Sequence, residues 1–130
     1  MKLKNFILAG FAGGIVDFLL GWLFYGFVFS SYFPPEQMPN LLFIFLGCMS
    51  FGFLASYLFT ELTNLTVFSS GLKRGAIVGL FVALINNFFV RAGSMEVNYE
   101  GFAIDVVIAI IIGSIVGGVV AAVNGALSRP

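Results

Sequence analysis

Histidine is absent from this sequence of 130 residues, and cysteine occurs once, as Cys48. Without a histidine or a second cysteine the chain has no soft metal-ligand set, and Cys48 cannot form an intrachain disulfide. The motifs Gly-x-Ser-x-Gly and Gly-x-Gly-x-x-Gly are missing as well. We therefore expect a non-catalytic protein without a cofactor or a bound metal, in which Cys48 is a small core residue.

Charge is also scarce. Charged residues make up 9% of the chain, six basic and six acidic, whereas soluble domains carry about 25%. No basic patch is present, which argues against binding of nucleic acid. Hydrophobic residues account for 60% of the chain and leave no room for a soluble domain. The composition predicts a single transmembrane domain over residues 1–130, with the lipid bilayer as its surroundings.

Four long apolar runs fill most of the sequence. About 20 apolar residues are needed to cross a bilayer as a helix, and these runs are continuous rather than alternating, which excludes a β-barrel. In lipid the backbone hydrogen bonds must close within each segment, so we expect an all-α, polytopic membrane four-helix bundle. The first run is too long for a signal peptide and is predicted to be a retained helix. The predicted helices cover about residues 5–29, 41–60, 72–90 and 102–123.

The basic residues predict the orientation. Five of the six would lie on one side of the membrane, and only Arg91 would lie on the other. Positive charge favours the cytoplasmic side, so both termini and the 61–71 connection are expected there, an N-in/C-in topology. The five residues are Lys2, Lys4, Lys73, Arg74 and Arg129.

Small residues recur at every fourth position in all four runs, so each predicted helix has one smooth face. Such faces allow close packing of helices in lipid, where apolar surface alone does not drive association. The alternative is that one face lines a pathway or binds another subunit. The four sets are Ala9, Gly13, Asp17, Gly21 and Tyr25; Cys48, Gly52, Ser56 and Thr60; Gly71, Gly75, Gly79, Ala83, Asn87 and Arg91; and Asp105, Ala109, Gly113, Gly117, Ala121 and Gly125.

Asp17 is the most informative polar residue, because it lies inside an otherwise uncharged run. A carboxylate at the bilayer centre costs about 2.5–3.5 kcal/mol on insertion scales. At 1.5 Å per residue, Asp17 lies about 18 Å beyond Asn5, and Asn86 and Asn87 lie about 20 Å beyond Lys73. An amide of Asn86 or Asn87 is therefore a feasible donor to Asp17.

A second polar pair is predicted where the third and fourth helices meet. Arg91 lies one turn beyond Asn87, and Asp105 lies near the start of the fourth helix. Pairing Arg91 with Asp105 would neutralise two costly groups and join the helices. Asp17 would then lack a partner of opposite charge, and desolvation would favour its neutral form. Such a carboxyl is either a relay group for protons or cations or a static hydrogen-bonding group.

These features favour a structural or accessory membrane protein, either self-associating as a homo-oligomer or bound to a larger membrane complex. An ion or proton channel or transporter centred on Asp17 is the alternative. A weaker alternative is a binder of lipid or another hydrophobic ligand, which would use the faces rich in phenylalanine, a residue that occurs 17 times.

The segments Gly21-Trp22-Leu23-Phe24-Tyr25-Gly26 and Val123-Asn124-Gly125, together with the length and helix count, resemble an uncharacterised family of small bacterial integral membrane proteins. The resemblance implies a location in the bacterial inner (cytoplasmic) membrane and no catalytic residues. Fluoride channels share the size, but their signature motifs are not found here. Small multidrug exporters carry a glutamate at about the place of Asp17, which is an analogy only.

Overall fold

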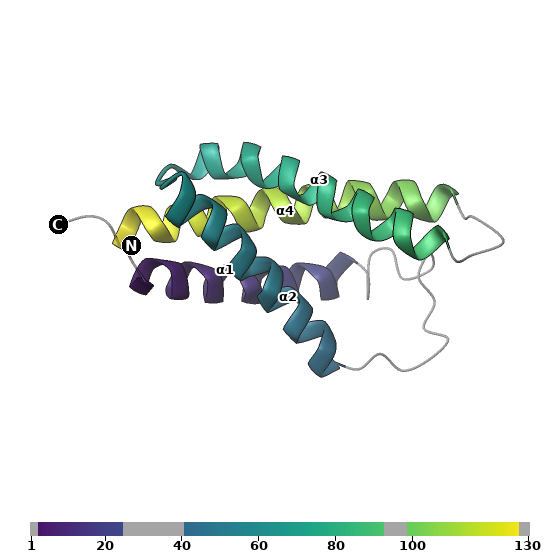
Figure 1. Cartoon of the computed structure of the whole chain (residues 1–130), viewed down its shortest axis with the longest axis horizontal. Helices are drawn as coiled ribbons and strands as arrows, with labels where there is room; N and C mark the ends of the chain where they lie inside the picture. The colour runs from purple at the N-terminus through teal and green to yellow at the C-terminus, as the bar shows by residue number, and fades with distance from the viewer. Residues whose placement is uncertain (1–2, 25–40, 93–98, 128–130) are drawn as a thin grey trace.

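The structure is a computed structural model, and it describes residues 3–24, 41–92 and 99–127 (Figure 1). The prediction of an all-α chain is confirmed for these residues, and four of their helical stretches are long and apolar enough to cross a membrane. A short π-helix, η3, continues α2. The elements are α1 (Leu3–Leu23), α2 (Leu41–Ser56), η3 (Tyr57–Leu62), α3 (Phe68–Ala92) and α4 (Tyr99–Leu127).

Three helix boundaries differ from the approximate predicted ones. The third helix begins at Phe68 instead of residue 72, and the fourth spans Tyr99–Leu127 instead of 102–123. The serines before Gly71 were assigned to the connection, but hydroxyl residues are well tolerated in the first turn of a helix. The backbone N–H of Gly71 already donates to the carbonyl of Val67, at 3.1 Å. The predicted end of the first helix, at residue 29, lies outside the described residues.

The helix α4 is the central element. It lies beside α3 along most of its length and also packs against α1, while α2 crosses α1 obliquely (Figure 1). The start of α1, the end of α4 and the short connection between η3 and α3 therefore lie at one end of the bundle (Figure 1). This arrangement brings together segments that are far apart in the sequence.

Close approach of α3 and α4 depends on glycine. A Cβ atom added at Gly113 would lie 2.6 Å from the carbonyl oxygen of Gly75, and one added at Gly117 would lie 2.8 Å from the Gly75 Cα. The obstacle in both cases is backbone, which cannot rotate aside as a side chain can. The small faces predicted for these helices thus pack directly against each other. The facing residues are Gly71, Gly75 and Gly79 of α3 and Ala109, Gly113 and Gly117 of α4.

Close packing at glycines also joins α1 to α2. A Cβ atom at Gly52 would lie 2.6 Å from both the Gly10 carbonyl oxygen and the Gly14 Cα. The adjoining side of α1 meets branched side chains of α4, since a Cβ atom at Gly13 would lie 2.8 Å from a methyl group of Val120. One helix therefore contacts α2 and α4 through different small residues.

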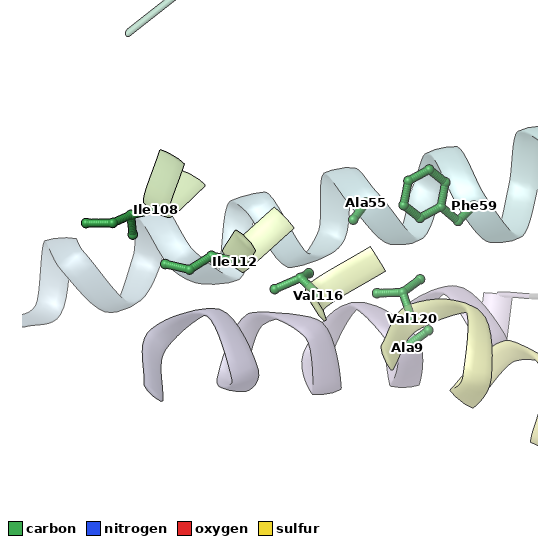
Figure 2. Packing of buried hydrophobic residues seen from close by; sticks show 7 residues of the cluster. All are labelled: Ala9, Ala55, Phe59, Ile108, Ile112, Val116 and Val120. Atoms are coloured by element: carbon green, nitrogen blue, oxygen red, sulfur yellow. The ribbon is translucent and has the colours of Figure 1, made fainter. Parts of the chain in front are cut away.

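The buried apolar core is narrow (Figure 2). Val116 and Val120 of α4 are fully buried, next to Ala9 of α1. Large apolar side chains remain exposed on every long helix, a surface expected against lipid but not against water. Examples are Phe11, Leu54, Phe81 and Val107. The whole core cluster is Ala9, Ala55, Phe59, Ile108, Ile112, Val116 and Val120.

Candidate intramembrane polar site

Polar side chains of the described helices meet at three levels along the bundle. Each set joins segments that are distant in the sequence. We call them the terminal asparagine cluster (Asn5, Asn64 and Asn124), the central pair (Asp17 and Cys48) and the distal pair (Asn87 and Asp105).

The central pair joins α1 to α2. The partly buried carboxyl of Asp17 lies against the thiol of Cys48, which is partly buried as well and can donate a hydrogen bond to it. The helix register explains the pairing. Because α2 runs antiparallel to α1 and Gly52 packs on Gly14, a step of four residues back along α2 corresponds to about one turn forward along α1. That step places Cys48 against Asp17.

Asp17 thus has a partner that the sequence did not indicate. The suggested donors were Asn86 and Asn87, but the Asn87 amide donates to Asp105 and to its own helix, and the Asn86 side chain is exposed. The prediction placed these groups at one depth but did not consider which helices are neighbours. The helix α3 packs chiefly on α4, not on α1.

The distal pair joins α3 to α4. The side-chain nitrogen of Asn87 donates to Asp105 Oδ2 and, at 2.8 Å, to the Ala83 carbonyl. Asn87 is buried, with 5% of its surface exposed, whereas Asp105 is partly exposed. Both residues continue the four-residue spacing of the glycines that bring these helices together. The backbones are close enough here for an amide to reach across.

Arg91 was expected to pair with Asp105. The backbone of Arg91 belongs to α3, but its side chain lies outside the described residues, so the pairing stays a prediction. Asp105 accepts a hydrogen bond from Asn87 in any case. This carboxyl therefore does not depend on Arg91 alone for a partner.

The terminal asparagine cluster is the most extensive polar network in the described part of the chain. The Asn5 amide donates to Asn124 Oδ1 at 2.8 Å, and the Asn124 amide donates to Asn64 Oδ1 at 3.0 Å and to the Leu65 carbonyl at 2.8 Å. Asn5 and Asn124 are buried, with 4% and 1% of their surfaces exposed. The cluster thereby joins α1, α4 and the connection that precedes α3.

Local geometry prepares this cluster. Asn64 has a φ of 49°, a left-handed conformation that asparagine adopts more readily than most residues. The backbone N–H of Leu65 donates to the Phe59 carbonyl at 2.5 Å, which turns the chain at the end of η3. As a result, the Asn64 side chain and the Leu65 carbonyl are both presented to Asn124.

Hydroxyl groups add two contacts between helices. The buried Ser56 hydroxyl of α2 donates to the Phe6 carbonyl of α1 at 2.7 Å. The Ser114 hydroxyl of α4 donates to the Leu72 carbonyl of α3 at 2.9 Å. These bonds bring a side chain of one helix to the backbone of its neighbour, which again requires close approach.

The chemistry available at these sites is hydrogen bonding. The residues that the structure describes contain no group of three or more histidine, cysteine, aspartate or glutamate side chains that could hold a metal ion. The central pair combines one carboxyl with one thiol, and the distal pair combines one carboxyl with one amide. Each arrangement can hold two helices together, and Asp17 is the only one of these acids in the middle of a span.

Sequence analysis missed Cys48 as a partner and the terminal asparagine cluster as a whole. Cys48 lies four residues before Gly52 on the small face of its helix, and this position could have indicated a contact with the first helix. Cys48 was instead predicted to be a core residue. The three asparagines lie at or beyond the ends of apolar runs that the topology prediction placed on one side of the membrane. Three asparagines at the same end of the predicted bundle could have indicated that they meet.

The comparisons with known proteins give no further guide. No protein-family model matches the sequence, and neither the curated proteins nor the solved structures contain a match. The resemblance to small bacterial membrane proteins thus rests on the segments quoted above, and the functional argument rests on the geometry.

Proposed function

We propose that this chain is a non-catalytic integral membrane protein with a structural or accessory role, acting through helix contacts with further copies or with a larger membrane complex. The location proposed for it is the bacterial inner membrane, with both termini in the cytoplasm. A location in a membrane is supported by the described helices, since four of them are long and apolar enough to span a bilayer.

The observation that carries the proposal is the use of the polar side chains. In the described helices, the central pair, the distal pair and the terminal asparagine cluster each connect different segments of the bundle. Their hydrogen-bonding groups meet one another across the contacts between these segments. This is the arrangement expected of a scaffold whose polar groups fix the helix packing.

The exposed surface supports the second half of the proposal. Apolar side chains cover the outward faces of all four long helices, and the core between them is narrow. A small membrane protein with little surface outside the bilayer has mainly these faces for recognition. Association with other membrane helices uses them directly.

Purification in mild detergent tests the role. We expect the chain to elute as an oligomer or together with another membrane protein, with its mass determined by light scattering. A lone monomer at every detergent concentration, with no accompanying chain, would contradict the proposal. A monomer that carries bound lipid or another apolar ligand would instead support the ligand-binding alternative.

The proposed topology has its own test. Single cysteines are introduced by Lys2→Cys and Gln37→Cys in a Cys48→Ser background, and intact cells are labelled with a membrane-impermeant maleimide. We expect labelling of the Gln37→Cys variant only. Labelling of both variants from the same side would contradict a cytoplasmic N-terminus followed by one membrane crossing.

A second candidate function is ion or proton movement through Asp17. The observation in its favour is that this carboxyl is only partly buried in the described structure and its partner, Cys48, is partly exposed too. A titratable acid in mid-span is the usual element of such a pathway. Flux in liposomes under proton and sodium gradients tests this, with Asp17→Asn as the comparison. Absence of flux from the unmodified protein under both gradients would end this candidate.

A further inference from the structure

Asn86 forms no hydrogen bond with the residues that the structure describes, and its side chain is exposed on α3. The neighbouring amide of Asn87 donates to the Ala83 carbonyl one turn back, but no described residue forms such a bond with Asn86. An amide that is exposed to hydrocarbon without a partner is costly, and a bond to the backbone of its own helix would be the simplest remedy. Asn86 does not form this bond to its own helix.

The position of Asn86 places it inside the apolar layer. It lies 12 residues beyond Arg74, which is exposed near the start of α3, and this corresponds to about 18 Å along the axis. The hydrocarbon layer is about 30 Å thick, so water at either surface is out of reach when Arg74 lies at the interface. In the proposed bilayer, a second molecule at the same depth would supply the hydrogen bond that the described residues do not give to Asn86.

The residues around Asn86 form a surface suited to a helix. Val82, Ile85 and Phe89 are exposed to 38%, 57% and 77% of their surfaces and lie four before, one before and three after Asn86. Positions spaced in this way share one face of a helix. We call this set the α3 outer face. It carries no charge, and the exposed basic residues Lys73 and Arg74 lie three turns away.

We infer that the α3 outer face is the contact between two copies of this chain, joined by a pair of Asn86 side chains. A carboxamide has both a donor and an acceptor, so it is complementary to itself. Two copies inserted in the same direction and related by a two-fold axis place both Asn86 residues at one depth, where each amide satisfies the other. A single buried asparagine pair fixes register and a dimeric state in the same way in coiled coils.

This inference depends on the proposed self-association and specifies its surface. Another membrane protein would need a polar group at the same depth on a matching face, whereas a second copy supplies one by symmetry. The contacts of α3 with α4 follow every fourth residue, through Gly71, Gly75 and Gly79 to the buried Ala83 and Asn87. Val82 and Asn86 stand beside this buried row and are exposed.

Cross-linking of the full-length chain in lipid vesicles tests the surface. Val82→Cys is placed on the α3 outer face and Ile77→Cys on the other exposed side of α3, both in a Cys48→Ser background. The two probes are aliphatic, outward-facing and on the same helix, so they are a matched pair. Mild oxidation is expected to give a covalent dimer with Val82→Cys and none with Ile77→Cys.

The asparagine is tested by dimer affinity, measured by energy transfer between labelled copies in vesicles. Asn86→Leu is expected to weaken association by about three- to thirtyfold, the range for interhelical hydrogen bonds of about 0.6–2 kcal/mol. Asn86→Gln, which keeps the carboxamide, is expected to retain most of the affinity. Circular dichroism and thermal unfolding serve as controls that both variants remain folded.

The outcomes distinguish a failure of the α3 interface from a failure of the proposed self-association. Unchanged dimerisation in Asn86→Leu, with no cross-link through Val82→Cys, would overturn the α3 interface and leave self-association standing. A chain that is monomeric in vesicles and binds no other protein would overturn both. A cross-link from Val82→Cys to a different protein in native membranes would overturn the second copy as the occupant.

Discussion

The side-chain nitrogen of Asn5 lies 2.8 Å from Oδ1 of Asn124, a residue 119 positions later in the chain. This bond closes the bundle, because it joins the start of α1 to the end of α4. Asn124 also donates to Asn64 and to the Leu65 carbonyl, so one buried amide holds three segments together.

Asn124→Ala is therefore expected to destabilise the fold by about 2 kcal/mol, since three hydrogen bonds are lost and interhelical bonds in membrane proteins average about 0.6 kcal/mol each. Asn5→Ala should cost less. The double variant should cost less than the sum of the two, because the two residues share a bond. Unfolding in mixed detergent micelles measures all three free energies. Strict additivity would show that the two amides do not interact.

A second prediction concerns the contact between α3 and α4. Gly113→Ala places a methyl group 2.6 Å from the Gly75 carbonyl oxygen, and the helices must separate to accept it. We expect a loss of about 1–3 kcal/mol in the free energy of unfolding, as for other overpacked sites.

Gly47→Ala is the matched control, because an added Cβ atom there meets no atom within 4 Å. It makes the same chemical change in a helix and should leave stability unchanged or slightly raised. Equal losses in the two variants, measured by the same detergent titration, would argue against close helix contact at Gly113.

The distal pair yields a third prediction. Removing Asp105 leaves the buried Asn87 amide with only its intrahelical bond, so Asp105→Ala and Asn87→Ala should be coupled by about 0.5–3 kcal/mol in a double-mutant cycle. Thermal unfolding of the two single variants and the double variant provides the measurement.

Arg91→Ala extends the same cycle. If Arg91 also pairs with Asp105, its removal should destabilise the chain, and the further change Asp105→Ala should recover part of the loss. Fully additive losses for Arg91 and Asp105 would show that these two side chains do not meet, whatever the result with Asn87.

The four helices could be predicted from the sequence because their signal is local. A continuous apolar run of sufficient length has to form a helix in lipid, whichever neighbours it acquires. The starts of α3 and α4 were placed too late for an equally local reason: polar residues before Gly71 and Phe102 resemble a loop, although helices accept them in the first turn.

The partners within the site were harder to predict. Asp17 was found because a carboxylate in an apolar run is visible by itself. Its contact with Cys48 depends on the register between α1 and α2, which is set by the packing of glycines from both helices. A local sequence pattern does not show which residues of two distant helices will meet. The role of Asn64 depends on a left-handed backbone conformation, and asparagine permits this conformation without requiring it.

The last prediction separates the two interpretations of Asp17. As a static hydrogen-bonding group, it needs only a polar side chain that can contact the Cys48 thiol. Asp17→Asn, which keeps an acceptor oxygen, should then change the free energy of unfolding by less than about 1 kcal/mol, while Asp17→Leu should cost about 1–3 kcal/mol by leaving the thiol without its partner and crowding α2. Cys48→Ser should be tolerated, and Cys48→Val should resemble Asp17→Leu.

Flux through the same variants in liposomes distinguishes a static group from a relay. A static role predicts no flux in the unmodified protein and none in Asp17→Asn, with stability following hydrogen-bonding capacity alone. A relay predicts a different result. Asp17→Asn would keep the fold but abolish flux, because an amide does not ionise at neutral pH as a carboxyl can. If flux requires the Asp17 carboxyl but stability does not, the scaffold role is rejected for this residue. The terminal asparagine cluster and the distal pair would then be the polar contacts that hold the bundle together.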